Sequence, residues 1–189
     1  MAKNHFILAF LFLIPWIVSG QVHIPQGPVS GTFQASQSPY YIDGDVEVPG
    51  DSILVVEPGV DIFFSDAYSF MVRGRLLAIG TADSNITWQP IQGDWKGITF
   101  RDIDLSSQDT SRLEFCNISG CNEYNGGALE FQSAGRAILT ECIIHDNLAV
   151  NGGAAFFRFS DVTFNGCTIH TNRALDGAGI YAHISNPVF

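Results

Sequence analysis

Short apolar runs separated by turn residues dominate the chain after its first 20 residues, and no helical period of 3.6 is visible there. The clearest runs are DVEV at 45–48, ILVV at 53–56, DIFF at 61–64, FMV at 70–72, LLAI at 76–79, ITW at 86–88, GITF at 97–100 and LEFCNI at 113–118. Gly and Pro stand in the gaps between them, as at 49–50, 58–59 and 93. Runs of this kind are typical of β-strands, so the pattern predicts an all-β protein.

An internal repeat occupies the second half of the chain. LEFCNISGCNEYNGGALEF from Leu113, LTECIIHDNLAVNGGAAFF from Leu139 and FNGCTIHTNRALDGAGIYA from Phe164 align with one another. The aligned columns are Cys116, Cys142 and Cys167, then Ile118, Ile144 and Ile169, then Asn147 and Asn172, where the first copy has Cys121. A period of about 25 residues with several strands and no helix is typical of a solenoid of stacked coils. The L-x-x-L-x-L spacing of leucine-rich repeats is missing, and a propeller blade needs about 40 residues.

Strand parity separates the interior of each coil from its surface. Cys142 and Ile144 point to one side of a strand, and Ile143 and His145 to the other. Because the Cys and Ile columns recur in every copy, we expect them to face inward. Asn147 and Asn172 then lie at a bend, where an amide ladder can satisfy turn carbonyls. The Gly-Gly pairs that follow permit the backbone of a sharp corner.

The N-terminus has the features of a signal peptide. Lys3 precedes an apolar run over 6–18, and small residues suit cleavage before Gln21. A membrane anchor is the alternative, but the run is shorter than the ~20 residues that span a bilayer. We therefore expect a signal peptide over 1–20, a polar leader over 21–38 and a β-helix domain over 39–189, secreted or at the cell surface. A solenoid needs a capping end and none is visible, so we expect a truncated chain that holds the N-terminal coils only.

The pattern resembles bacterial secreted right-handed parallel β-helix proteins, with a pectin-lyase-like solenoid. The matching segments are SPYYIDGDVEVPGDSILVVEPGVDIFF at 38–64, VRGRLLAIGTADSNITW at 72–88 and GDWKGITF at 93–100. The C-x-I-x-x-N-x-A-x-x-G-G-A repeat is similar to repeats of polymorphic outer-membrane and autotransported surface proteins. This resemblance implies a right-handed fold and export. It does not imply one activity, because the fold carries structural, adhesive and carbohydrate-active proteins alike.

Composition narrows the range of partners. The chain is 46% hydrophobic and 15% charged, with a formal net charge of −10. An acidic surface repels phosphate backbones, which argues against nucleic acid as a partner. No second apolar stretch of spanning length follows the signal peptide, so we expect no membrane span in the mature chain. Polysaccharide or cell-surface components remain as candidate partners.

Four cysteines, Cys116, Cys121, Cys142 and Cys167, allow three interpretations. Export makes disulfides feasible. No pair has the C-x-x-C spacing of a zinc site, so a metal is disfavoured. Since three of the cysteines align one per coil and face inward, a column of buried free thiols is the favoured interpretation.

Two further groups of residues are weak candidates for binding. His145 and His170 should stack on the outer face, where they could hold a metal or contact sugar hydroxyls, although a solvent-facing column is favoured. Asp102 and Asp104 lie at a loop inserted over 103–111, and carboxylates there could bind Ca²⁺. No calcium motif is present, so a solvated loop is favoured and no metal or cofactor is predicted.

No complete catalytic set is visible in the sequence. The Asn-Thr-Asp, Asp-Asp and Gly-His-Gly motifs of polygalacturonase-like enzymes do not occur, and no pair of cooperating carboxylates can be placed. Arg101 beside Asp102 is the nearest approximation to a lyase-like site. The leading hypothesis is therefore an exported, non-catalytic solenoid that presents a surface for adhesion, cell-surface structure or glycan binding. The alternative is a polysaccharide lyase or glycoside hydrolase whose active coils lie beyond residue 189.

Overall fold

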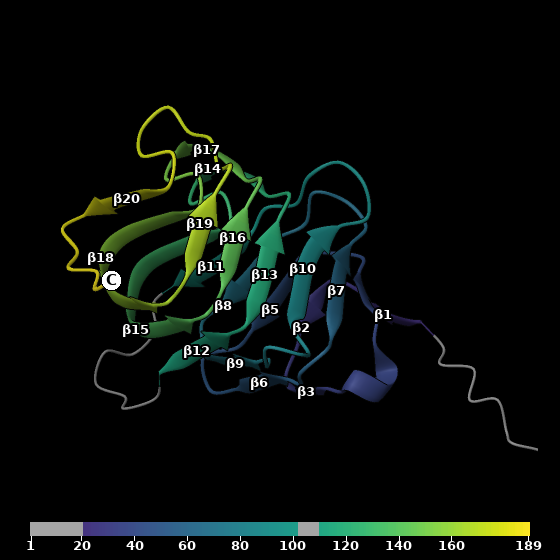
Figure 1. Ribbon diagram of the computed structural model, residues 1–189. Helices are drawn as coiled ribbons and strands as arrows, with labels where there is room; N and C mark the ends of the chain where they lie inside the picture. Colours follow the sequence, from purple (N-terminus) through teal and green to yellow (C-terminus); the bar gives the residue numbers. More distant parts are fainter. Residues whose placement is uncertain (1–20, 102–109) are drawn as a thin grey trace, which may run out of the picture.

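The protein is a parallel β-helix. The computed structural model describes residues 21–101 and 110–189, which form about 6 turns of stacked parallel strands (Figure 1). Among these residues the one helical element is a short 3-10 turn, η1 (Ala35–Gln37). The coils follow one another from the purple N-terminal end to the yellow C-terminal end. The predicted all-β solenoid is confirmed.

One sheet contains a strand from every coil. Its seven described strands, in spatial order, are β1 (Val22–Ile24), β4 (Tyr40–Ile42), β7 (Asp61–Phe64), β10 (Ile86–Pro90), β13 (Cys116–Ser119), β16 (Ile143–His145) and β19 (Thr168–His170). Spatial order equals sequence order, and every pairing is parallel. Each coil therefore adds one strand directly beside its predecessor, at the ~4.8 Å spacing of a sheet.

Two further stacks of parallel strands complete the wall of the solenoid. One holds β2 (Gly27–Pro28), β5 (Val46–Val48), β8 (Phe70–Val72) and β11 (Ile98–Arg101), and the other holds β3 (Gly31–Phe33), β6 (Ile53–Val56), β9 (Arg75–Ile79) and β12 (Ser111–Glu114). Both stacks continue into β15 (Leu129–Thr140) and β18 (Ala155–Asn165), and β20 (Ile180–His183) follows β18. β14 (Asn122–Asn125) and β17 (Leu148–Asn151) form a separate two-stranded sheet.

Residues 21–38 belong to the solenoid, which corrects the prediction of a polar leader. β1 pairs with β4, β2 with β5 and β3 with β6. Val29 and Phe33 are buried in the common core. Strands of two or three residues are too short to show periodicity, so the sequence pattern did not reveal them. The first coil therefore begins at β1.

Side-chain alternation fills the interior with stacked aromatic rings. Trp95 lies 3.8 Å from Phe64 between ring centroids, and its Nε1 donates to the Ser119 carbonyl at 2.9 Å. Phe100 stacks on Phe131 at 4.7 Å and 6°. The four aromatic residues are fully buried. Such pairs contribute roughly 0.5–1.5 kcal/mol each beyond the area they bury.

A ladder of asparagine side chains forms hydrogen bonds with backbone amides and carbonyls at the bend after the seven-stranded sheet. Asn147 Nδ2 donates to the Ile118 carbonyl at 3.3 Å, and Asn172 Nδ2 donates to the Ile144 carbonyl at 2.8 Å. Asn147 Oδ1 accepts from the Cys121 amide at 3.0 Å, and Asn172 Oδ1 accepts from the Asn147 amide at 3.1 Å. Each amide thus links its own bend to the coil before it.

Left-handed backbone positions recur at the corners. Within one coil they are Glu141, Asp146, Gly152 and Phe159, and 25 residues later they are Gly166, Thr171, Gly177 and Ile184, all with φ between 50° and 69°. Next to one such corner, a Cβ on Gly153 would lie 2.3 Å from the Ala178 carbonyl oxygen of the following coil. The Gly-Gly pair therefore serves two needs, a left-handed corner and a close approach of two coils.

Candidate functional site

A polar cleft lies on the outer face of β8, β11 and β15, beside β14. Its volume is about 240 Å³, and its lining residues are Ser69, Met71, Lys96, Thr99, Arg101, Glu123, Tyr124, Asn125 and Glu130. Four separate segments, 69–71, 96–101, 123–125 and Glu130, therefore contribute to one hollow. Because the fold is a stack, residues more than 60 positions apart in the chain become neighbours there.

Strand alternation places the functional side chains outward. Phe100 and Phe131 point into the core, so their neighbours Thr99 and Glu130 point out, and these two are paired in register across β11 and β15. Arg101 and Gln132 form the next outward pair. Thr99, Arg101 and Glu130 of this array line the cleft, and Gln132 lies beside them on β15.

Glu130 is the most deeply placed charged group of the cleft. Its side chain is 9% exposed, and its Oε1 accepts from Gln132 Nε2 at 2.5 Å. Its Oε2 lies 3.9 Å from an Arg101 terminal nitrogen, too far for a hydrogen bond. Burial raises the pKa of Glu130, against the opposing effects of the Gln132 side-chain hydrogen bond, the Arg101 guanidinium and a second side-chain hydrogen bond from Asn125.

One nitrogen of the Arg101 guanidinium has no hydrogen-bond partner. Its Nε is buried and has no hydrogen-bond partner, although the side chain as a whole is 35% exposed. Lys96 and Glu123 also line the cleft, so charges of both signs surround the space. Tyr124, 63% exposed, stands at its rim. Most buried polar groups in proteins are paired, so Arg101 Nε is an exception among the described residues.

The sequence prediction missed Glu130 and considered Arg101 only beside Asp102, as the nearest approximation to a lyase-like site. The signal was present in the repeat, because Glu130 aligns with Phe156 and Tyr181, which stack on each other at 5.5 Å and 6°. Glu130 therefore lies between Thr99 of the preceding coil and the aromatic pair of the two following coils.

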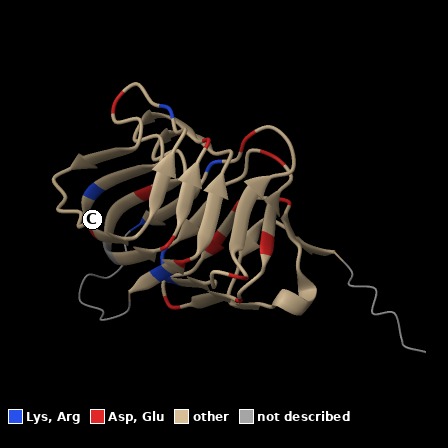
Figure 2. Cartoon of the chain, in the orientation of Figure 1, with Lys and Arg blue, Asp and Glu red and all other residues tan. Residues whose placement is uncertain are grey.

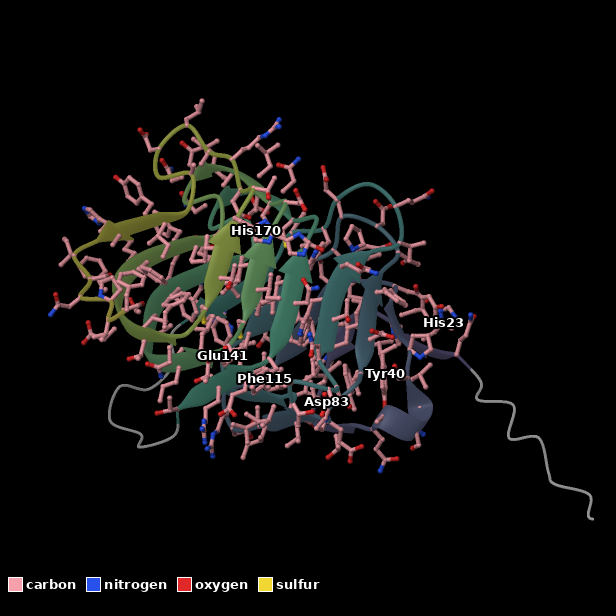
Figure 3. All side chains as sticks on the ribbon, viewed as in Figure 1. His23, Tyr40, Asp83, Phe115, Glu141 and His170 are labelled. Atoms are coloured by element: carbon pink, nitrogen blue, oxygen red, sulfur yellow. The ribbon has the colours of Figure 1, made fainter. Side chains whose placement is uncertain are left out.

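The predicted histidine pair lies on the outer face of the seven-stranded sheet. His145 and His170 stack at 5.1 Å and 5° between β16 and β19. Figure 3 labels His170 on β19. His145 is already engaged at both ring nitrogens, with Asp146 Oδ2 at 2.6 Å and Asn117 Oδ1 at 2.8 Å. Few charged residues lie on this face (Figure 2). The two rings meet face to face, so they present mainly their edges to solvent.

The cysteine column lies inside the solenoid, and all four thiols are free. Cys116 and Cys142 are buried and Cys167 is partly exposed. Cys142 Sγ contacts the Leu113 carbonyl at 3.3 Å. The neighbouring Cys116 thiol, together with burial, raises the pKa of Cys142, and burial raises the pKa of Cys121. Raised thiol pKa values are typical of unreactive structural cysteines.

Two further weak candidates, Asp102 and Asp104, cannot be assigned to the cleft or away from it. Asp102 and Asp104 lie outside the described residues, between β11 and β12. Among residues 21–101 and 110–189, no group of three or more His, Cys, Asp or Glu side chains is placed to hold a metal ion. Nor does any described helix have the length and apolar character needed to cross a membrane. Ile118 and Ile144 are fully buried, and Ile169 is packed against the core.

Comparison with known proteins identifies the fold family. No curated protein and no solved structure matches this chain. The family model described as "Right handed beta helix region" matches residues 81–189, more than half of the sequence. Those residues contain the three aligned repeats, the asparagine ladder and most of the cleft. The chain therefore belongs to the right-handed β-helix family.

Proposed function

We propose that this chain is an exported, non-catalytic β-helix solenoid that binds glycans through the cleft formed by β8, β11, β14 and β15. The observation that carries the proposal is an outward-facing polar hollow in which the Glu130 carboxylate and the Arg101 guanidinium lie near each other, with an exposed tyrosine at its rim. A rigid, repetitive wall suits recognition of an extended, repetitive polymer.

The physical support is the combination of groups in the cleft. Sugar hydroxyls both donate and accept, so they pair with carboxylate, guanidinium and amide groups alike. Tyr124 adds an apolar ring with a polar tip at the opening. The strands hold these groups on a rigid sheet, so little conformational entropy is lost when a ligand binds.

Glycan binding is tested with the purified full chain on an oligosaccharide array, followed by isothermal titration of the strongest hits. We expect Tyr124→Ala and Arg101→Ala to weaken binding. Gln89→Ala, on the outer face of the seven-stranded sheet, is the matched control and should bind like the original chain. Equal binding by all variants would place the interaction elsewhere, and absence of any glycan binding would refute the proposal.

Export is the second part of the proposal, and it rests on the apolar segment over 6–18. Expression of the whole chain in a bacterial host, with mass spectrometry of the medium and envelope fractions, tests it. We expect a product that begins at Gln21. A cytoplasmic product that retains Met1 or Lys3 would contradict export.

A polysaccharide lyase or glycoside hydrolase is the second candidate, favoured by one observation. Glu123 and Glu130 line the same cleft, and burial raises the pKa of Glu130, as expected for a general acid. Incubation with polysaccharides, with reducing ends and unsaturated products measured over time, distinguishes the two candidates. Turnover that disappears in Glu130→Gln would favour the enzyme.

A further inference from the structure

The polar cleft meets a second hollow on its N-terminal side. That hollow has a volume of about 440 Å³ and lies over β2, β5 and β8, with Gln26, Asp45 and Glu47 among its lining residues. Ser69 and Met71 line both this hollow and the cleft. The two depressions therefore share one boundary and follow each other along the outer face of the same sheet.

A third hollow adjoins the cleft on its C-terminal side. Its volume is also about 440 Å³, and it lies over β14 and β17. Glu123 and Tyr124 line both this hollow and the cleft. Leu148 and Val150 provide its apolar part, and Leu148 is 46% exposed. The three depressions thus form one row, called the groove, which extends from β2 to β17.

Strand pairing fixes the floor of the groove in register. Glu47 pairs with Met71 across β5 and β8. Thr99 pairs with Met71 on one side and with Glu130 on the other. These four outward positions form one column parallel to the solenoid axis, with one residue per coil at the ~4.8 Å strand spacing. A rigid row of evenly spaced side chains matches a ligand that is itself linear and repetitive.

We propose that the groove binds a linear glycan chain whose residues lie one after another from coil to coil and fill all three hollows. This inference rests on the proposed glycan-binding function and adds the length and direction of the ligand. The cleft alone, at about 240 Å³, is smaller than the ~300–1,000 Å³ of typical small-molecule sites, whereas each flanking hollow adds about 440 Å³. Met71 and Tyr124, at the two boundaries, offer apolar surface on which sugar rings can pack.

The charges of the lining favour an uncharged chain. Among the described residues that line the three hollows, carboxylates outnumber cations: the acids are Asp45, Glu47, Glu123 and Glu130, and the bases are Lys96 and Arg101. A chain of uronates or sulfated sugars would therefore be repelled. Uncharged oligosaccharides are the appropriate probes for the groove.

The test is isothermal titration of the full chain with short and long members of the same series, namely cellobiose with cellohexaose and mannobiose with mannohexaose. We expect at least one hexasaccharide to bind about tenfold or more tighter than its disaccharide, because linked contacts add affinity without a second loss of translational freedom. Gln26→Ala and Leu148→Ala, at opposite ends of the groove, should each weaken the hexasaccharide by about threefold or more. Gln89→Ala, on the seven-stranded sheet, is the control and should change nothing.

The outcomes separate the extended groove from the broader proposal. Equal affinities for disaccharide and hexasaccharide, or a hexasaccharide that only one of the two end variants weakens, would overturn the extended groove while glycan binding stands. If neither hexasaccharide binds, the groove proposal fails, and if the oligosaccharide array shows no binding either, glycan binding fails with it. Gln26 and Leu148 are exposed, so their replacement leaves the core intact, and circular dichroism checks that both variants are folded.

Discussion

The inward position of Ile144 provides a sharp test of the coil geometry. Its side chain is fully buried, and it is paired in register with Ile118 on one side and Ile169 on the other. Its neighbour Ile143 points outward on the same strand and is only partly buried. Two isoleucines that differ by one position therefore have opposite environments.

The magnitudes follow from this difference. Ile144→Ala removes buried methyl groups and leaves a cavity, at about 2–5 kcal/mol. Ile144→Asp adds an unpaired carboxylate to the core, which costs several kcal/mol more and is comparable with the roughly 5–15 kcal/mol that stabilises a typical domain. Ile143→Asp, the matched control, should cost about 1 kcal/mol or less, because the carboxylate stays in water.

Urea unfolding followed by circular dichroism measures these differences. We expect Ile144→Ala to lower the transition midpoint clearly, Ile144→Asp to accumulate as insoluble protein, and Ile143→Asp to unfold almost like the original chain. Equal losses for Ile143→Asp and Ile144→Asp would refute the inward assignment, and with it the register of the whole repeat.

Three further predictions concern other parts of the fold. Asn147→Ala should lower the free energy of unfolding in urea by about 1–3 kcal/mol, because it leaves the buried Cys121 amide and Ile118 carbonyl without their side-chain partner. Asn122→Ala, at an exposed position, is the control and should change that free energy little. Because burial raises the pKa of Glu130, the folded state holds that proton more tightly than the unfolded state. The free energy of unfolding should therefore decrease as pH rises above the ordinary pKa range of glutamate. Glu130→Gln should flatten this part of the stability profile. An unchanged profile in the variant would contradict the raised pKa of Glu130. A thiol reagent should modify the partly exposed Cys167 first and reach Cys142 only on unfolding, while equal rates in the folded protein would contradict the buried column.

Much of the fold was readable from the sequence because a solenoid repeats its local environment in every coil. The Cys and Ile columns, the asparagine positions and the Gly-Gly corners recur every 25 or 26 residues, so their period reveals strands, bends and interior together. Residues 21–38 were not readable in this way. Their strands are two or three residues long, and only pairing with the next coil gives them regular structure.

The cleft, in contrast, depends on the tertiary structure. Arg101, Glu123 and Glu130 come from three different strands, and nothing in their spacing along the chain indicates that they line one hollow. The sequence does show that Glu130 aligns with Phe156 and Tyr181 in the repeat, but it does not show what surrounds that carboxylate. Burial, the missing partner of Arg101 Nε and the balance of charges arise only when successive coils are stacked in register. The repeating pattern therefore determined the architecture, because each coil meets the same neighbours, whereas the stacking of non-repeating side chains decided where the polar cleft lies.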